Sequence, residues 1–268
     1  MSRKIAFIGV GNMASAIING ITNVGGIPYA DLVLTDAFPE KCNDFAAKGA
    51  TVTSTVTEAA SLADCIVLSV KPQNFPEILP LLATVPGVEK KLFVTIAAGI
   101  TVDTVRSALH GAPTVRVLPN TPMLIGMGVS AICRSDIVAP EDFSFVCSMF
   151  EASGRVILID ESEMNRIISV TSSSPAYVFA FIHAICEGAR AQGLTNEGIL
   201  DAVCDMVIGS ATLLKNGGIS PEEQIKRVTS KGGTTERAMG VFTERGLSAM
   251  VSDAMQACTD RADELSRG

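Results

Sequence analysis

The chain has 268 residues, 47% of them apolar and 18% charged, enough to bury a sizeable core in one large domain or two ordinary ones. Its formal net charge of −7, without a run of Lys or Arg, disfavours nucleic acids and anionic membranes as partners. The seven cysteines are scattered and form no Cys/His cluster in the sequence, so we expect neither a disulfide framework nor a metal site. The first residues, Met1-Ser-Arg-Lys, lead directly into an apolar strand, so we expect no signal peptide, and no apolar run is long enough to predict a spanning helix. We therefore expect a cytoplasmic protein.

Short apolar runs alternate with helical stretches through the first 160 residues. Strands that are apolar on both faces are typical of parallel sheets with helices on both sides, so the pattern predicts a doubly wound, mostly parallel α/β sheet. The expected strands are residues 5–8, 32–35, 51–53, 66–70, 92–96 and 114–118, and two runs at the sheet edge, 129–133 and 155–159. The expected helices are residues 12–24, 39–48, 75–83, 102–109 and 140–152.

A glycine-rich turn stands between the first strand and the first helix. Gly9 permits the tight turn, Gly11 lets a diphosphate approach the backbone, and Ala14 lets the helix pack closely on the strand. The helix that opens at Asn12 presents backbone N–H groups and the positive end of its dipole to an anion. The turn therefore predicts a Rossmann-type dinucleotide site; the alternative is a tight turn without a ligand.

Ligands of such sheets bind beyond the carboxyl ends of the strands. The small, polar or proline-flanked residues there are expected to contact the cofactor: Ser69, Val70, Lys71, Pro72, Ala97, Ala98, Gly99 and Asn120. Asp36 follows the second strand, where an acidic residue binds an adenine ribose and disfavours a 2′-phosphate. Asp36 favours NADH, but Lys41 or a backbone nest can still hold a phosphate, so the expected cofactor is NADPH or NADH.

Strand signals end near Asp160, and helical patterns follow at 163–191, 197–214, 221–228, 234–245 and 247–265. We place a Rossmann-type NAD(P)-binding domain at 1–161 and a helical dimerisation and substrate domain at 162–268, with Ser162 and its acidic neighbours as a helix cap. Apolar faces this wide favour a homodimer that can assemble further, with an internal bundle as the alternative.

Two features interrupt the helical part. The segment Ser230-Lys-Gly-Gly-Thr-Thr235 precedes a helix, and its hydroxyls, paired glycines and helix start suit a small carboxylate, or else form a helix-cap turn. Pro175 is expected to kink a long helix, either as a purely structural bend or to open a place where the hydroxyls of Thr171-Ser-Ser-Ser174 face a ligand.

The sequence offers little for acid–base catalysis. Of its two histidines, His110 lies in a loop and His183 on an apolar helix, where a core position is expected. No Ser/His/Asp set or carboxylate pair stands out in the sequence. Hydride transfer to an already protonated C=N bond needs no such help, whereas carbonyl reduction requires a proton donor.

In this order, the motifs resemble those of pyrroline-5-carboxylate reductases over essentially the whole chain. The matching segments are 8–14, 69–73, 97–99, 116–122, 174–177 and 230–235. The resemblance implies NAD(P)H-dependent reduction of 1-pyrroline-5-carboxylate to L-proline, the last step of proline biosynthesis. It implies that Asn12 and Met13 contact the diphosphate and that Lys71, Pro72 and Ala97 contact the nicotinamide half.

The resemblance also implies a substrate site. Its carboxylate loop consists of Ser230, Gly232, Gly233, Thr234 and Thr235, with Ser230 and Thr235 as the catalytic residues and Thr235 near the substrate nitrogen. Ser174, before Pro-Ala-Tyr, is a further expected substrate contact.

The chain departs from the family pattern at three places. Ser172 and Ser174 stand where glycines are usual, and Lys231 stands where proline is usual. The segment before that loop is one residue short and lacks a common Asp. These departures bear on the substrate range.

Two alternative functions stay open. One is a β-hydroxyacid dehydrogenase-like oxidoreductase, whose catalytic Lys has no counterpart between Lys91 and Lys215. The other is a non-catalytic cofactor-binding or regulatory homologue.

Overall fold

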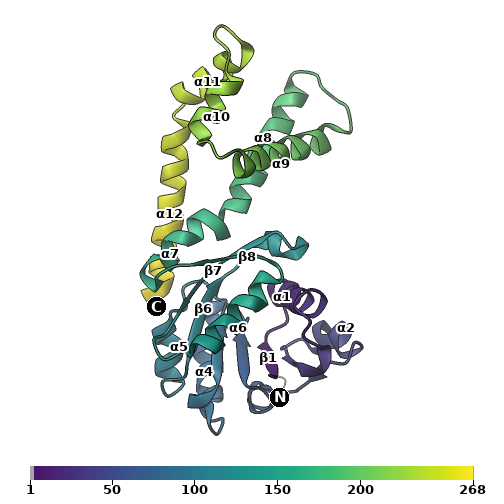
Figure 1. Ribbon diagram of the computed structural model, residues 1–268, viewed down its shortest axis with the longest axis vertical. Helices are drawn as coiled ribbons and strands as arrows, with labels where there is room; N and C mark the ends of the chain where they lie inside the picture. Colours follow the sequence, from purple (N-terminus) through teal and green to yellow (C-terminus); the bar gives the residue numbers. More distant parts are fainter. Residues whose placement is uncertain (1–2, 268) are drawn as a thin grey trace. The chain divides into compact units, whose positions relative to one another are not determined.

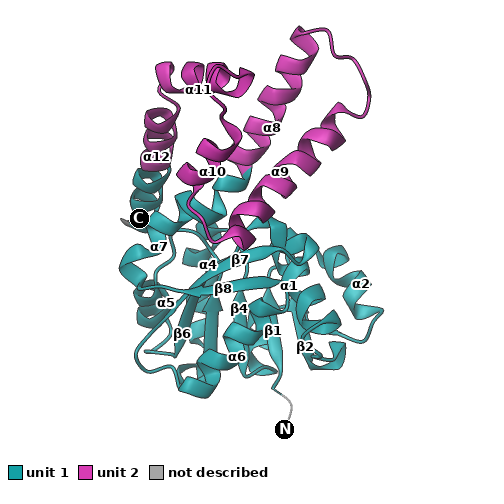
Figure 2. Cartoon of the chain, turned by 45° about the horizontal axis from the view of Figure 1, so that its top comes forward, with its two compact units in different colours: residues 1–175, 258–268 teal, residues 176–257 magenta. Residues whose placement is uncertain are grey.

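The structure is a computed structural model that describes residues 3–267. The chain forms two compact units, residues 1–175 with 258–268 and residues 176–257 (Figure 2). It therefore crosses between the units twice, at 175/176 and at 257/258. The division into functional domains at 161/162 stays a prediction.

The first unit contains a β-sheet (Figure 1). It has eight strands in the order β3-β2-β1-β4-β5-β6-β7-β8. The strands are β1 (Ile5–Ile8), β2 (Leu32–Thr35), β3 (Thr51–Val52), β4 (Cys65–Leu68), β5 (Leu92–Thr95), β6 (Thr114–Leu118), β7 (Gly128–Arg134) and β8 (Gly154–Leu158). Neighbouring strands are parallel except β6 and β7, which pair antiparallel. The predicted mostly parallel sheet is confirmed.

Helices cover both faces of this sheet. One face carries α1 (Asn12–Asn23), α2 (Asn43–Ala46) and α6 (Pro140–Glu151), and the other carries α3 (Val56–Ser61), α4 (Phe75–Ala83) and α5 (Val102–Ala108). Strand β1 shows how the sequence produces this arrangement. Ile5 and Phe7 belong to the first core cluster, and Ala6 and Ile8 belong to the second. Successive side chains of a strand point to opposite faces, so a strand buried on both sides must be apolar throughout.

Two predicted helices differ from the observed ones. Residues 39–48 form a 3₁₀ turn at Pro39–Cys42 followed by the short α2. The predicted helix 163–191 is divided into α7 (Met164–Ile167), a π-helical turn (Ile168–Ser172) and α8 (Ser174–Ala191). The N–H of Ser173 donates to the carbonyl of Ile168 at 2.8 Å, five residues back. Pro175 has no N–H to continue the α-helical ladder, and the predicted kink takes the form of this widened turn.

The second unit is helical. It contains most of α8, together with α9 (Ile199–Gly217), α10 (Pro221–Val228) and α11 (Thr234–Glu244), and α12 (Leu247–Arg267) leads back into the first unit. Many apolar side chains of these helices are exposed in the single chain, among them Phe179 and Ile208. The predicted core position of His183 is wrong for the single chain, because this residue is exposed on α8.

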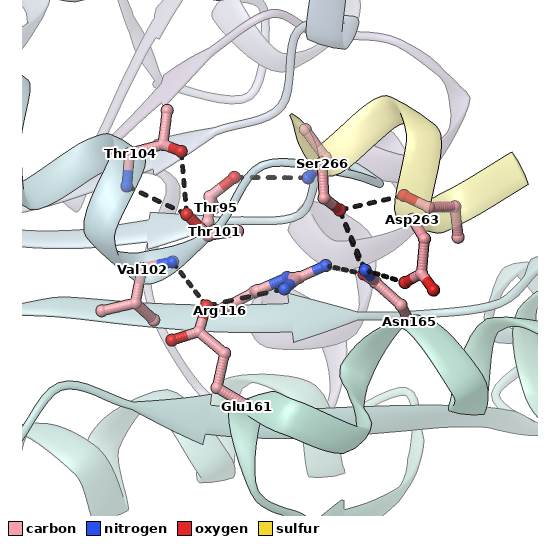
Figure 3. A network of polar contacts seen from close by, with 11 residues as sticks. Thr95, Thr101, Val102, Thr104, Arg116, Glu161, Asn165, Asp263 and Ser266 are labelled. Atoms are coloured by element: carbon pink, nitrogen blue, oxygen red, sulfur yellow. Dashed lines mark hydrogen bonds and ion pairs between the residues drawn. The ribbon is translucent and has the colours of Figure 1, made fainter. Parts of the chain in front are cut away.

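A buried guanidinium ties the sheet to the last helix within the first unit (Figure 3). The side chain of Arg116, on β6, is 1% exposed, and its Nη2 donates to the Asn165 side-chain oxygen at 2.9 Å. The Asn165 amide nitrogen in turn donates to Asp263 at 2.8 Å and to the Ser266 hydroxyl at 3.0 Å, both on α12. Burial lowers the pKa of Arg116, and the nearby Glu161 carboxylate opposes this shift.

Glu161 has a second role in this network. Its carboxylate lies 3.5 Å from Nη1 of Arg116 and accepts the N–H of Val102, the first residue of α5, at 2.6 Å. Ser162 was expected to cap a helix at this point, and that prediction is wrong. Among residues 3–267, no side chain caps the turn Glu161–Glu163 or the start of α7. The acidic side chain instead reaches across the fold to a different helix.

We predict that Glu161→Ala lowers the free energy of unfolding by about 2 kcal/mol, because the buried Arg116 charge and the Val102 N–H both lose a partner. This is below the usual cost of breaking a fully buried pair, because the Glu161 side chain is 34% exposed. The measurement is the urea midpoint of the full chain. Glu163→Ala is the matched control, since Glu163 pairs with Arg166 at the exposed surface, and it should move the midpoint little. Equal midpoints for the two variants would refute the role of Glu161.

Candidate cofactor and substrate sites

A cleft of about 580 Å³ opens in the first unit where β1, β2 and β4 end. It brings together residues that lie far apart in the sequence. Six of the predicted cofactor residues line it: Gly9, Gly11, Asp36, Ser69, Val70 and Lys71. The carboxyl-end rule for parallel sheets thus locates the cleft from strand positions alone.

The first glycine of the turn is required by the protein's own packing. Gly9 has a φ of +94°, and an added Cβ would lie 2.9 Å from the carbonyl oxygen of Ser69. The Gly9 N–H donates to the Thr35 carbonyl at 2.8 Å, and the Ser69 hydroxyl donates to the Gly9 carbonyl at 2.7 Å. These bonds hold the turn against β2 and β4, so any larger residue here would strain the fold.

Gly11, the second glycine of the turn, is not required by packing. An added Cβ at Gly11 would meet no described atom within 4 Å, so packing does not require glycine there. Gly11 is also the cap residue of α1, and among residues 3–267 no side chain caps this helix. By contrast, Thr55 and Thr101 cap α3 and α5 through their hydroxyls. The open space and the uncapped N–H groups fit a diphosphate approaching the backbone.

Other predicted cofactor residues lie around the cleft without lining it. Asn12 and Met13 begin α1, and Ala14 behind them is buried in the core. Pro72 begins a 3₁₀ turn after β4. After β5, Ala97 is buried in the core and Ala98 is exposed. Their cofactor contacts stay predictions.

Gly99 and Asn120 have contacts within the first unit. An added Cβ at Gly99 would lie 3.0 Å from the Cβ of Leu265 on α12, so this glycine allows a close approach of that helix. The Asn120 amide donates to the Thr171 carbonyl at 2.9 Å, and its oxygen accepts the N–H of Val129 at 2.8 Å. Asn120 thereby joins β7 to the π-helical turn. A cofactor role for either residue stays a prediction.

Several cleft residues were not predicted from the sequence. Ser54 and Val56 follow β3, the edge strand, so the carboxyl-end rule includes them. A further group lies at the start and along one face of α4: Asn74, Glu77, Ile78 and Leu81. Their spacing of three and four residues is the helical signal that marks this face.

The predicted carboxylate loop forms one turn in the second unit. Gly232 has a φ of +75°, and the Gly233 N–H donates to the Ser230 carbonyl at 3.0 Å. Thr234 and Thr235 open α11, and both are exposed. Glu236 accepts the Gly232 N–H at 2.7 Å, so a carboxylate already occupies one donor of this turn. Ser174 belongs to the first unit, where its hydroxyl donates to the Val170 carbonyl.

A doubly wound sheet with an uncapped glycine turn at its carboxyl edge is the arrangement of dinucleotide-dependent oxidoreductases. Residues 161–265 match the family model of pyrroline-5-carboxylate reductase dimerisation, and residues 4–99 match that of coenzyme F420-dependent NADP oxidoreductases. Relatives that are 33% and 36% identical over essentially the whole chain show that it belongs to the pyrroline-5-carboxylate reductase family.

Individual relatives cover the whole chain. It is 33% identical to pyrroline-5-carboxylate reductase of Escherichia coli strain K12 over 100% of both chains. It is 36% identical to that of Vibrio alginolyticus, over 99% of this chain and 98% of the relative. A solved structure of a pyrroline-5-carboxylate reductase from Coxiella burnetii is 30% identical, with a TM-score of 0.90 and 99% of each chain covered. The predicted family, fold class and NAD(P)H-dependent oxidoreductase class are confirmed.

We predict that Gly11→Val weakens NAD(P)H binding more than tenfold, which corresponds to over about 1.4 kcal/mol, because its side chain fills the space of the diphosphate. Thermal stability should change little, since a Cβ added at Gly11 meets no described atom within 4 Å. Calorimetric titration and a melting curve measure the two effects. Gly9→Ala is the comparison, and it should lower the melting temperature as well. Unaltered binding by the Gly11 variant would mean that the motif is only a turn.

Proposed function

We propose that this chain catalyses the NAD(P)H-dependent reduction of 1-pyrroline-5-carboxylate to L-proline, using the cleft of the first unit and the glycine turn of the second. Family membership over the full length carries the proposal. The bound cofactor supplies a hydride, which reduces the carbon of the C=N bond. The protonated imine nitrogen takes up the electron pair of that bond, so no imidazole is required at the reacting atoms.

The chain's own residues bind and orient the reactants. In the cleft, the turn around Gly9 and Gly11 and the start of α1 hold the diphosphate, with Asn12, Met13 and Ala14 behind them. The expected contacts to the remainder of the cofactor are Asp36, Ser69, Val70, Lys71, Pro72, Ala97, Ala98, Gly99 and Asn120.

On the substrate side, N–H groups and hydroxyls of the Ser230–Thr235 turn bind the carboxylate, in competition with Glu236 for the Gly232 N–H. The Thr235 hydroxyl accepts the N–H of the iminium and orients it for hydride transfer. The Ser230 side chain packs under Gly233, where an added Cβ would lie 2.5 Å from its hydroxyl oxygen, and shapes the turn. Ser174 is proposed as a further substrate contact.

The two alternatives make different predictions. A β-hydroxyacid dehydrogenase would need a Lys in the stretch where the sequence has none, between Lys91 and Lys215. A non-catalytic homologue would bind NAD(P)H without turnover. Oxidation of NADH and NADPH with pyrroline-5-carboxylate, compared with 3-hydroxyacids and NAD(P)⁺, separates all three.

We also propose that the protein is a cytoplasmic homodimer, which can assemble further. The expectation that no apolar run is long enough to span a membrane is wrong by length and composition, because the helical segment 161–191 passes that test, and few residues of its most apolar stretch are buried in the single chain. A second copy of the helical unit is the proposed cover for this face, because residues 161–265 match the family's dimerisation model. The π-helical turn at Ile168–Ser172 also interrupts regular helix within this stretch.

We predict that light scattering shows a dimer or a multiple of dimers at micromolar concentration. Ile208→Asp should reduce the mass toward that of one chain, because it places a charge on an apolar face that is covered in the dimer. Ile208 is 61% exposed in the single chain. Ile137→Asp is the control, since Ile137 is 51% exposed but lies in the first unit. A stable monomer of the unmodified chain would sink the dimer hypothesis.

We predict that Thr235→Ala lowers kcat/KM for pyrroline-5-carboxylate by one to three decades, about 1.4 to 4 kcal/mol of transition-state stabilisation. Affinity for NAD(P)H should stay nearly unchanged, because the cleft residues belong to the other unit. Steady-state kinetics and cofactor titration measure both. Thr243→Ala, at the far end of α11, is the control and should be silent.

His183→Ala tests the absence of imidazole chemistry. Turnover and its pH profile should stay unchanged in a folded dimer, because hydride transfer to a protonated imine needs no imidazole. The assignment of roles is wrong if Thr235→Ala is silent and His183→Ala abolishes turnover.

A further inference from the structure

Asp36 lines the cleft of the first unit. It follows β2 directly, and its side chain is 8% exposed. One carboxylate oxygen accepts the Val10 N–H at 2.7 Å, and the other accepts the Phe38 N–H at 2.9 Å. Val10 belongs to the glycine turn, so this carboxylate joins the turn to the segment after β2.

Lys41 is the third partner of this carboxylate. Its Nζ lies 3.2 Å from Oδ1 of Asp36 and 4.7 Å from the centroid of the Phe38 ring. Lys41 also lines the cleft, together with Asp36 and Phe38. Lys41 is therefore already paired with a carboxylate at the cleft.

The charge of Asp36 persists at neutral pH. Burial raises the pKa of this carboxyl, but the hydrogen bonds from Val10, Phe38 and Lys41 outweigh burial and hold the pKa below its ordinary value. Removing the charge would leave two backbone N–H groups with weaker acceptors.

Counting acceptor sites shows what this carboxylate can still bind. A carboxylate offers about four lone-pair sites, and three of them are used by Val10, Phe38 and Lys41. One more donor can be accepted, and a ribose 2′-hydroxyl supplies one. A 2′-phosphate brings negative charge and acceptor oxygens instead, so it meets Asp36 with like charge and no hydrogen bond.

We propose that Asp36 makes this reductase select NADH over NADPH, and that Lys41 is a latent 2′-phosphate ligand which Asp36 holds in an ion pair. The proposal rests on the proposed function only in that the cleft binds NAD(P)H. Asp36 is also a positioning residue, because the same carboxylate fixes the Val10 N–H in the glycine turn.

Calorimetric titration with NAD⁺ and NADP⁺, without substrate, tests this selectivity apart from turnover. The unmodified chain should bind NAD⁺ at least tenfold more tightly. Asp36→Asn keeps an acceptor for one N–H and removes the charge. It should therefore reduce the preference for NAD⁺ over NADP⁺ at least tenfold, mainly because NADP⁺ binds more tightly. The double variant Asp36→Asn with Lys41→Met should lose this gain in NADP⁺ affinity, because the lysine that would bind the 2′-phosphate is gone. Glu77→Gln, another carboxylate in the cleft, is the matched control and should leave the ratio unchanged.

A preference of the unmodified chain for NADP⁺ overturns the proposal, whether or not the variants fold. So does an Asp36→Asn variant that melts normally and keeps the original ratio. Retention of the NADP⁺ gain in the double variant overturns the role of Lys41. If both dinucleotides bind with the expected ratio but pyrroline-5-carboxylate is not reduced, the proposed reaction fails and the selectivity stands. If neither binds, both fail.

Discussion

The uncapped start of α1 is the feature on which the cofactor site is built. Three other helices, α3, α5 and α10, begin with a hydroxyl that accepts a backbone N–H: Thr55, Thr101 and Ser220. At α1 the corresponding residue is Gly11, which has no side chain to offer. Glycine at this position costs only a few tenths of a kcal/mol relative to a hydroxyl cap, so Gly11 leaves backbone donors for an anion at little cost in stability. The neighbouring Val10 N–H is not free for a ligand, because the Asp36 carboxylate already accepts it at 2.7 Å. Some backbone donors of the turn are therefore bound within the protein, and others are available to a ligand.

The predictions succeeded where the signal was local. Strand β1 is apolar at four successive positions, which indicates burial on both faces. Gly9 and Gly11 lie two residues apart in the turn after it, although packing requires glycine only at Gly9. Features that depend on residues far apart were missed. Glu161 accepts the N–H of Val102, the first residue of a helix 59 residues earlier in the sequence, which no pattern around Ser162 indicates. His183 looked like a core residue because its helix is apolar, but an apolar helix is buried only where something covers it.

The cleft shows the same distinction between local and distant signals. The ends of β1, β2 and β4 were predicted to face a ligand because parallel strands share an edge. The face of α4 was missed, although Asn74, Ile78 and Leu81 have helical spacing. In the sequence this face is an ordinary amphipathic helix pattern. Only the strand order shows that α4 lies beside the cleft. The geometry of Asp36 likewise could not be predicted, because a sequence position near the ribose does not specify which donors the carboxylate already holds.

The Arg116 network has a consequence for the two crossings between the units. The first follows α7, which carries Asn165, and the second precedes the last turns of α12, which carry Asp263 and Ser266. Because the Asn165 amide binds both of these residues and Arg116, the two crossing segments are fastened to each other and to β6 inside the first unit. Gly99 adds to this arrangement, since its missing Cβ lets α12 approach the loop after β5. The π-helical turn before Pro175 is also held within the first unit, because the Asn120 amide donates to its Thr171 carbonyl at 2.9 Å.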